Sequence, residues 1–353
     1  MTAGITTTSA GAGRGPSPLR RRRRRLLIGF AVAAVALLVV CVLSLMVGSR
    51  AIDPAAVLNA LLHYDKSDEL SLIVVDSRLS RTLLGLFAGL ALGLAGTVMQ
   101  GLSRNPLADP GILGVNFGAS LAVVVAISVF GITTTSGYVW FAFAGAGLAA
   151  VVVYAVASVG REGATPIKLA LAGAAVSAAL GSLITAVLLT SQVSLDALRF
   201  WQVGSLAGRG FDVLWQVLPT IALGTVVALA LGRSLNGLAL GDDVARGLGQ
   251  RVGLSRAACA VAIVLLCGSA TAAVGPIAFV GLVVPHVARY VVGGDYRWVL
   301  AFSAVFAPTL LIACDVIGRV VAYPGELQVG VVTALVGAPV FIALVRRRKL
   351  VSL

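Results

Sequence analysis

The sequence predicts an all-α membrane protein, a polytopic bundle of about ten transmembrane helices with both termini in the cytoplasm. Apolar stretches of membrane-spanning length recur along the chain and are separated by short loops. Hydrophobic residues make up 59% of the sequence and charged residues 12%, whereas charged residues make up about a quarter of a soluble domain. Positive charges also gather on alternate loops, as they do in oriented membrane proteins. This composition excludes a large soluble domain.

The first apolar stretch, residues 26–47, contains 22 residues without a charge. Its length exceeds the apolar core of about 7 to 15 residues in a cleaved signal peptide, so we expect a retained helix. Arginines at positions 20–25 directly precede it, and this placement marks a cytoplasmic membrane border, not a nucleic-acid-binding arm, despite the net charge of +13. We expect residues 1–25 to form a disordered basic cytoplasmic tail.

The remaining spans follow from the same length criterion, since a helix needs roughly 20 apolar residues to cross the hydrocarbon core. Residues 257–292 are nearly one apolar block, too long for a single span, so we divide it at Gly275-Pro276. A short cytoplasmic tail at 347–353 ends the chain. The predicted spans are residues 26–47, 83–99, 111–131, 139–159, 169–189, 213–231, 257–274, 276–291, 298–317 and 329–345.

Charge bias supports this topology. With the N-terminal tail in the cytoplasm, 20 of the 27 Lys and Arg residues fall on the cytoplasmic side. In the second span, Gly85, Gly89 and Gly93 recur at intervals of four residues, which places small residues on one helix face. We therefore expect a close approach to a neighbouring helix there.

The polar residues argue against an enzyme. The chain has two histidines, His63 and His286, and neither lies in a His-Glu-x-x-His spacing; Gly-x-Ser-x-Gly is also missing from the sequence. We expect no metal site and read the four cysteines as small core residues. An ion-coupled secondary transporter is a further alternative, but it would place carboxylates at mid-membrane. Asp315 is the sole acidic residue deep in a predicted span, and Arg319 follows at the spacing of a helical ion pair.

Several motifs follow one another in a fixed order along the chain. The first three are Arg78-Leu-Ser-Arg81-Thr-Leu, then residues 89–96 together with Gln100, and then Arg104-Asn-Pro-Leu with the residues that follow it to Gly114. The next two are residues 201–206, and residues 235–241 together with Ala245 and 248–249. The last two are residues 275–282 together with 285, 286 and 289, and residues 315–319 together with Glu326, 329–334 and 337–339. Together they resemble the FecCD-type permeases of binding-protein-dependent ABC importers, from about residue 26 to the C-terminus. Residues 198–202 and 267–272 are most similar to the permeases for ferric catecholate siderophores of the enterobactin type.

The resemblance implies a type II ABC importer permease in a bacterial cytoplasmic membrane, with a permease domain at residues 26–346. Its implied partners are a second permease subunit, identical or homologous, two ATP-binding subunits, and an extracytoplasmic siderophore-binding protein. The implied cargo is a ferric siderophore, with haem or cobalamin as alternatives. The chain has no Gly-x-x-x-x-Gly-Lys-Ser/Thr loop, so we expect it to bind no cofactor and the partner ATPase to use ATP and Mg²⁺.

The resemblance also implies roles for three groups of residues. Arg78, Arg81 and Arg319 match outer-face arginines that dock carboxylates of the binding protein, and the alternative is that they anchor helix ends. A cytoplasmic loop at about 233–256 matches the coupling helices that contact the ATPase, and the alternative is a segment lying on lipid. The coupling residues are Leu240, Gly241, Asp242, Ala245, Arg246, Leu248 and Gly249.

A cytoplasmic gate is the third implied site. Asn105 and Leu107 match one gate position, and Pro166 with Ile167 match a second constriction before the fifth span. The alternative is that both segments are ordinary turns, because Asn-Pro favours turns in any context.

Overall fold

The computed structural model describes residues 18–48, 51–160 and 164–346, and every regular element in these ranges is a helix. Seven helices are long and apolar enough to cross a membrane, and three shorter apolar helices (α5, α14 and α16) accompany them. These ten apolar elements are α1 (Pro18–Met46), α3–η1–α4 (Glu69–Ser71, Leu72–Leu79, Ser80–Ser103), α5 (Val115–Ser128), α6 (Thr135–Ala157), α7 (Pro166–Leu188), α9 (Phe211–Ala230), α12–η3–α13 (Val252–Ile263, Val264–Gly268, Ser269–Val274), α14 (Val280–Val292), α15 (Tyr296–Val321) and α16 (Val329–Arg346).

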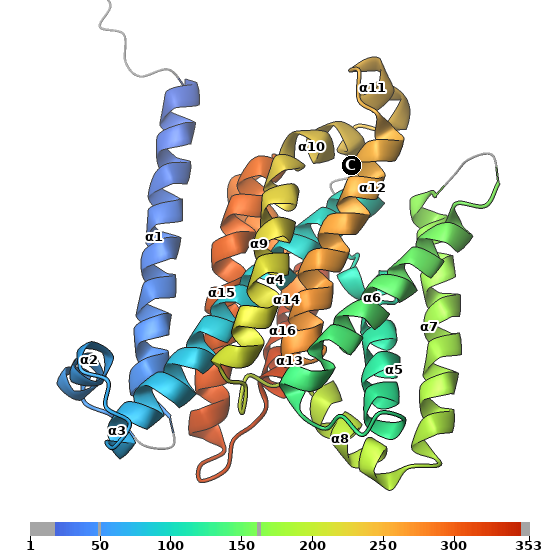
Figure 1. Cartoon of the computed structure of the whole chain (residues 1–353). Helices are drawn as coiled ribbons and strands as arrows, with labels where there is room; N and C mark the ends of the chain where they lie inside the picture. Colours follow the sequence, from blue (N-terminus) through green and yellow to red (C-terminus); the bar gives the residue numbers. More distant parts are fainter. Residues whose placement is uncertain (1–17, 49–50, 161–163, 347–353) are drawn as a thin grey trace, which may run out of the picture.

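Short helices connect the apolar elements at the two ends of the bundle (Figure 1). One end carries the start of α1 together with α10 (Gly232–Ala239) and α11 (Asp242–Gly247). Because the arginine run lies there, we call it the cytoplasmic end. The opposite, outer end carries α2 (Pro54–Leu62) and α8 (Gln192–Gln202). A 3₁₀ turn, η2 (Pro110–Leu113), directly precedes α5.

The ten predicted spans each correspond to one apolar helix, so the predicted fold class is confirmed. The predicted break in the 257–292 block is also present: α13 ends at Val274 and α14 begins at Val280. Gly275 between them has a φ of +78°, a conformation that favours glycine. The unpaired backbone near this break is satisfied by other segments, because Ser205 N–H donates to the Val274 carbonyl at 2.8 Å.

Two helix starts differ from the prediction. α1 begins at Pro18, so the arginines at 20–25 are helical, in keeping with the good helix propensity of Arg. The rest of the expected tails, residues 1–17 and 347–353, lies outside the described residues. The second span starts at Glu69 and continues through the π-helical η1 to Ser103. It extends beyond the predicted 83–99 because Arg78 and Arg81 are buried with partners inside the protein, which the apolar criterion does not anticipate.

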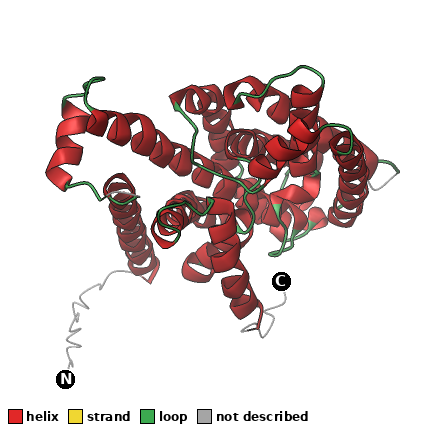
Figure 2. Ribbon diagram, turned by 90° about the horizontal axis from the view of Figure 1, so that it is seen from below, coloured by secondary structure: helices red, strands yellow, loops and turns green. Residues whose placement is uncertain are grey.

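α1 stands at the edge of the bundle (Figure 2), and only 6% of its most apolar 18-residue stretch is buried. α4 is the opposite case, since 78% of the most apolar 18-residue stretch within residues 69–103 is buried. The predicted glycine face of α4 lies against α15 and α14. A Cβ at Gly89 would lie 2.8 Å from the Pro308 nitrogen, one at Gly93 would lie 2.7 Å from the Ser303 carbonyl oxygen, and one at Gly96 would meet the backbone of Gly281. The expected close approach is thus confirmed.

This contact predicts different outcomes for two Gly to Ala substitutions. In Gly89→Ala the new methyl group would force the backbones of α4 and α15 apart, so we expect a lower midpoint of thermal unfolding for the protein purified in detergent. In Gly147→Ala on α6, the new Cβ would meet only one atom within 4 Å, a Val264 methyl carbon at 3.6 Å. This control should keep or slightly raise the midpoint, because Ala favours helix by about 1 kcal/mol over Gly. Equal midpoints for the two variants would contradict the proposed role of Gly89.

Candidate docking, coupling and gate sites

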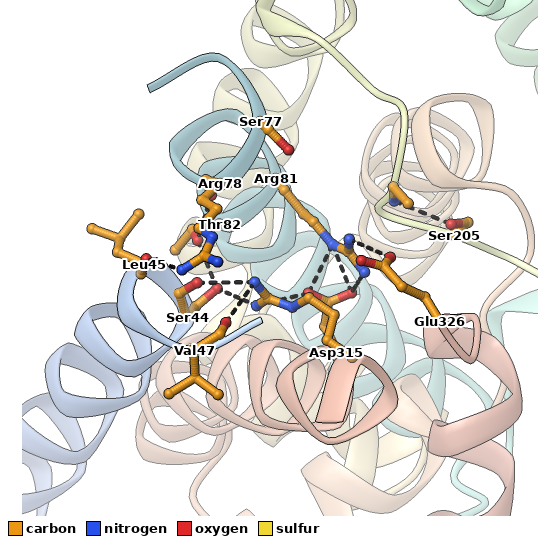
Figure 3. A network of polar contacts seen from close by, with 12 residues as sticks. Ser44, Leu45, Val47, Ser77, Arg78, Arg81, Thr82, Ser205, Asp315 and Glu326 are labelled. Carbon is orange, nitrogen blue, oxygen red and sulfur yellow. Dashed lines mark hydrogen bonds and ion pairs between the residues drawn. The ribbon is translucent and has the colours of Figure 1, made fainter. Parts of the chain in front are cut away.

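The three predicted docking arginines are buried at the outer end of the bundle. Figure 3 shows Arg78 and Arg81 there, close to Asp315 and Glu326. Arg81, in the first turn of α4, forms a two-pronged contact with Asp315 of α15: Nε lies 2.9 Å from Oδ2 and Nη2 lies 2.8 Å from Oδ1. Its Nη1 donates to Glu326 Oε2 at 2.7 Å. The Arg319 Nη2 lies 3.1 Å from the second Asp315 oxygen, so the helical pair expected from the sequence is present.

Two of these arginines also cap α1. The last carbonyls of a helix lack partners within that helix and carry its partial negative charge. Arg78 Nη1 donates to the Leu45 carbonyl at 2.8 Å. Arg319 Nη1 donates to the Ser44 and Val47 carbonyls at 2.9 and 3.1 Å, and its Nη2 donates to Ser44 Oγ at 2.7 Å. The arginines therefore connect α1 to the rest of the bundle.

Burial distinguishes these side chains from a freely accessible surface patch. Arg78, Arg81 and Arg319 are 5%, 7% and 2% exposed. Glu326 is the accessible member, with 36% of its side chain exposed. Arg81 and Arg319 share the Asp315 carboxylate, and Arg81 also pairs with Glu326. This geometry fits the anchoring hypothesis.

The predicted coupling loop folds into α10 and α11 and projects at the cytoplasmic end. Gly241 and Gly249 have φ values of +109° and +80° and form the turns on either side of α11. Ala245 is fully buried against Leu238 and Val252 and seats α11 on its neighbours.

The solvent-exposed surface of this loop carries three apolar side chains. Leu240, Val244 and Leu248 are 64%, 48% and 65% exposed. Apolar side chains that project together into water mark a surface that another protein covers. Arg246 pairs with Asp243 on the same helix at 2.8 Å, and both side chains are exposed.

The first residue of α11 has a different environment. The two carboxylate oxygens of Asp242 contact two arginines, Arg104 and Arg256. Only a quarter of its side chain is exposed. The sequence did not identify Arg104 or Arg256 as site residues, because their shared partner Asp242 is 138 and 14 residues away along the chain.

Both predicted gate segments lie at the same end: Asn105–Leu107 forms a turn, and Pro166–Ile167 lies in the first turn of α7. Asn105 Oδ1 accepts a hydrogen bond from Leu107 N–H at 2.9 Å, which closes the turn after α4. Pro166 is the first residue of α7, and the side chain of Thr165 caps that helix. The side chains of Leu107 and Ile167 are 43% and 74% exposed. Within the ranges given above, no group of three or more His, Cys, Asp or Glu residues has the arrangement of a metal site.

Comparisons with known proteins place this geometry in context. The profile of the FecCD transport family matches residues 36–347. The ferric enterobactin transport system permease protein FepD of Escherichia coli K12 is 47% identical over 312 residues, which cover 88% of this chain and 93% of that protein. The Fe(3+)-citrate import system permease protein YfmD of Bacillus subtilis 168 is 42% identical over 305 residues, which cover 86% of this chain and 90% of that protein.

Solved structures show the same architecture. An inward-facing metal-chelate type ABC transporter matches with a TM-score of 0.78 and 26% identity, over 92% of this chain and 99% of that chain. PsaBC from Streptococcus pneumoniae matches in fold, with a TM-score of 0.57 and 16% identity over 82% of this chain and 94% of that chain.

The buried ion cluster predicts a large difference between two Asp to Asn substitutions. Asp315→Asn would leave Arg81 and Arg319 buried without their shared carboxylate, which we expect to cost about 3–5 kcal/mol of unfolding free energy. The matched control is Asp196→Asn in α8, whose carboxylate is 58% exposed and lies 3.7 Å from Arg199. Its loss should cost no more than about 1 kcal/mol. Thermal unfolding in detergent compares the two, and similar midpoints would contradict the structural importance of Asp315.

Proposed function

Because the chain belongs to the FecCD transport family, we propose that it is the permease subunit of an ABC importer that carries a ferric siderophore across the bacterial cytoplasmic membrane. The observation that carries this proposal is the family match across the whole ten-span fold. The names of the two relatives described above support an iron chelate as cargo. As a permease subunit, the chain has no enzymatic activity of its own.

The energy for transport comes, on this proposal, from two separate ATP-binding subunits at the cytoplasmic end. One of them would contact the exposed apolar side chains of Leu240, Val244 and Leu248 around α11 of this chain. The glycine turns at Gly241 and Gly249 would let α11 enter a groove on the ATPase, with Arg246 at the border of the contact. A protein surface fits this segment better than lipid does, because Asp243 is 98% exposed there and an anionic leaflet would repel it.

The translocation path lies, on this proposal, between this chain and a second permease subunit, identical or homologous. Most of the core of the described chain is filled with tightly packed apolar side chains. α7 supports a partner contact, because only 17% of its most apolar window is buried. The segment Asn105–Leu107 follows the end of α4, and Pro166–Ile167 begins α7, both on the cytoplasmic side. There they would close the path after one substrate molecule has passed and before the next one enters.

A siderophore-binding protein would dock at the outer end, above the arginine cluster. Arg78, Arg81 and Arg319 come together there, and the Glu326 side chain that pairs with Arg81 is 36% exposed. Carboxylates of a binding protein would be attracted to these arginines, since arginine pairs with carboxylates in a bidentate geometry.

Uptake in cells tests the cargo. Deletion of the gene for this chain should abolish uptake of ferric enterobactin labelled with radioactive iron, and a plasmid copy should restore it. Uptake of labelled cobalamin and of haem in the same strains serves as the control and should not change. Loss of cobalamin or haem uptake with normal ferric enterobactin uptake would contradict the proposed cargo but not the permease assignment.

Binding in nanodiscs tests the docking site. An Arg78→Glu, Arg81→Glu double variant should bind the cargo-loaded binding protein more weakly, because removing one partner of a close interfacial charge pair costs about 2–5 kcal/mol. Arg199→Glu, at an exposed position of the outer end, is the matched control for a general change of charge and should bind nearly as the unaltered protein does. Only material that elutes as the folded permease is compared. Unchanged affinity of the double variant would contradict the docking role.

A further inference from the structure

Asp242 connects three separate segments at the cytoplasmic end. It is the first residue of α11, and each of its carboxylate oxygens contacts a different arginine. Oδ1 contacts Nη2 of Arg104, the residue that ends α4. Oδ2 lies 2.8 Å from Nη2 of Arg256 on α12. The Arg256 side chain is only 11% exposed, so this contact is largely shielded from water and from salt.

Each arginine continues the connection to one of the two gate turns. Arg104 has a φ of +50° and directly precedes Asn105, so its backbone is part of the first turn. Its Nε also donates to the Leu238 carbonyl at 2.7 Å. Arg256 Nη1 donates at 3.0 Å to the carbonyl of Ala164, two residues before Pro166. Asp242 is therefore linked through one arginine to each of the two predicted gate turns.

The other contacts of α11 within the described ranges are made with its flanking helices or inside α11 itself. The chain enters and leaves the α11 segment through Gly241 and Gly249, which have no atoms within 4 Å of a Cβ position and so have room to change conformation. Ala245 packs on Leu238 and Val252, which belong to the flanking helices. Asp243 pairs with Arg246 within α11.

We propose that Asp242 is the positioning residue that transmits movement of α11 to both cytoplasmic turns, so that ATPase movement and gate movement occur together. The inference rests on the proposed importer function. A carboxylate with two charged hydrogen-bonding partners resists displacement in two directions, and a displacement of α11 would pull on Arg104 and Arg256 together. Without Asp242, two arginines would face each other and the two turns would lose their shared contact.

The test compares Asp242→Asn with Asp196→Asn, at an exposed position of α8, in the complete importer, reconstituted in proteoliposomes with its ATPases and binding protein. Asn keeps the size of the side chain but removes its charge. We expect Asp242→Asn to lower the ratio of ferric siderophore transported to ATP hydrolysed by about tenfold, within the range typical of coupling between sites, while the ATPases still assemble and hydrolyse ATP. Asp196→Asn should leave the ratio unchanged. An unchanged ratio in Asp242→Asn would overturn the proposal, as would loss of ATPase assembly, which would instead make Asp242 a contact residue.

A distance measurement provides a readout that a merely structural role would not change. Spin labels at Gly247 of α11 and at Leu107, both exposed, report the separation of α11 from the first turn. In the importer with native Asp242 this separation should stay constant when ATP binds, because the two segments move together; in Asp242→Asn it should change. The same distance behaviour in both proteins would overturn the proposal.

Two features keep this test informative. If Asp242→Asn does not yield folded protein, Arg104→Gln carries the test, because it removes the link to the first turn and leaves the pair between Asp242 and Arg256 in place. It should also lower the transport ratio and release the label distance, and native behaviour in it would overturn the proposal. The distance measurement needs ATP but no cargo. Failure of the native importer to transport a ferric siderophore would therefore contradict the proposed cargo without deciding the role of Asp242.

Discussion

Direct contact between helix backbones along α4 is the constraint on which the rest of the structure depends. Gly89 and Gly93 bring α4 against α15, and Gly96 brings it against α14. In a membrane, where apolar side chains gain little by leaving lipid, such close packing is a main source of helix association. It also fixes the positions of the charged residues at both ends of α4. Arg81 reaches Asp315 at the outer end, and Arg104 reaches Asp242 at the cytoplasmic end.

The two ends of α4 are therefore held by one rigid element. Arg81 and Arg104 are separated by 23 positions along the chain, which corresponds to roughly 35 Å at about 1.5 Å per residue. Each arginine pairs with a carboxylate from a distant part of the sequence. Charged groups that are buried in a membrane protein must be paired to be tolerated. The pairing also gives each end of α4 a defined position relative to α15 or α11.

The sequence alone predicted the ten apolar helices and the break at Gly275-Pro276, because both depend on local patterns of apolar residues, glycine and proline. The loop around α11 was implied by the family resemblance. The sequence also predicted the pair of Asp315 and Arg319, which lie one helical turn apart. It did not predict the contact of Arg81 with Asp315, since these residues are 234 positions apart. The same limit applies to the contacts of Asp242, and to the helix before residue 83, where Arg78 and Arg81 are buried against distant partners.

The capping of α1 by Arg78 and Arg319 has a consequence for synthesis on the ribosome. α1 is the first of the described spans to be made, yet the Ser44 carbonyl in its last turn accepts a hydrogen bond from Arg319, which lies 275 residues later. At about 5–20 residues per second, this partner appears roughly 14–55 seconds after Ser44. Arg78, only 33 residues after Leu45, is made much earlier and caps part of the same helix end. The nearer arginine thus holds the first span to its neighbour during translation, and the distant one completes the attachment when the ninth span arrives.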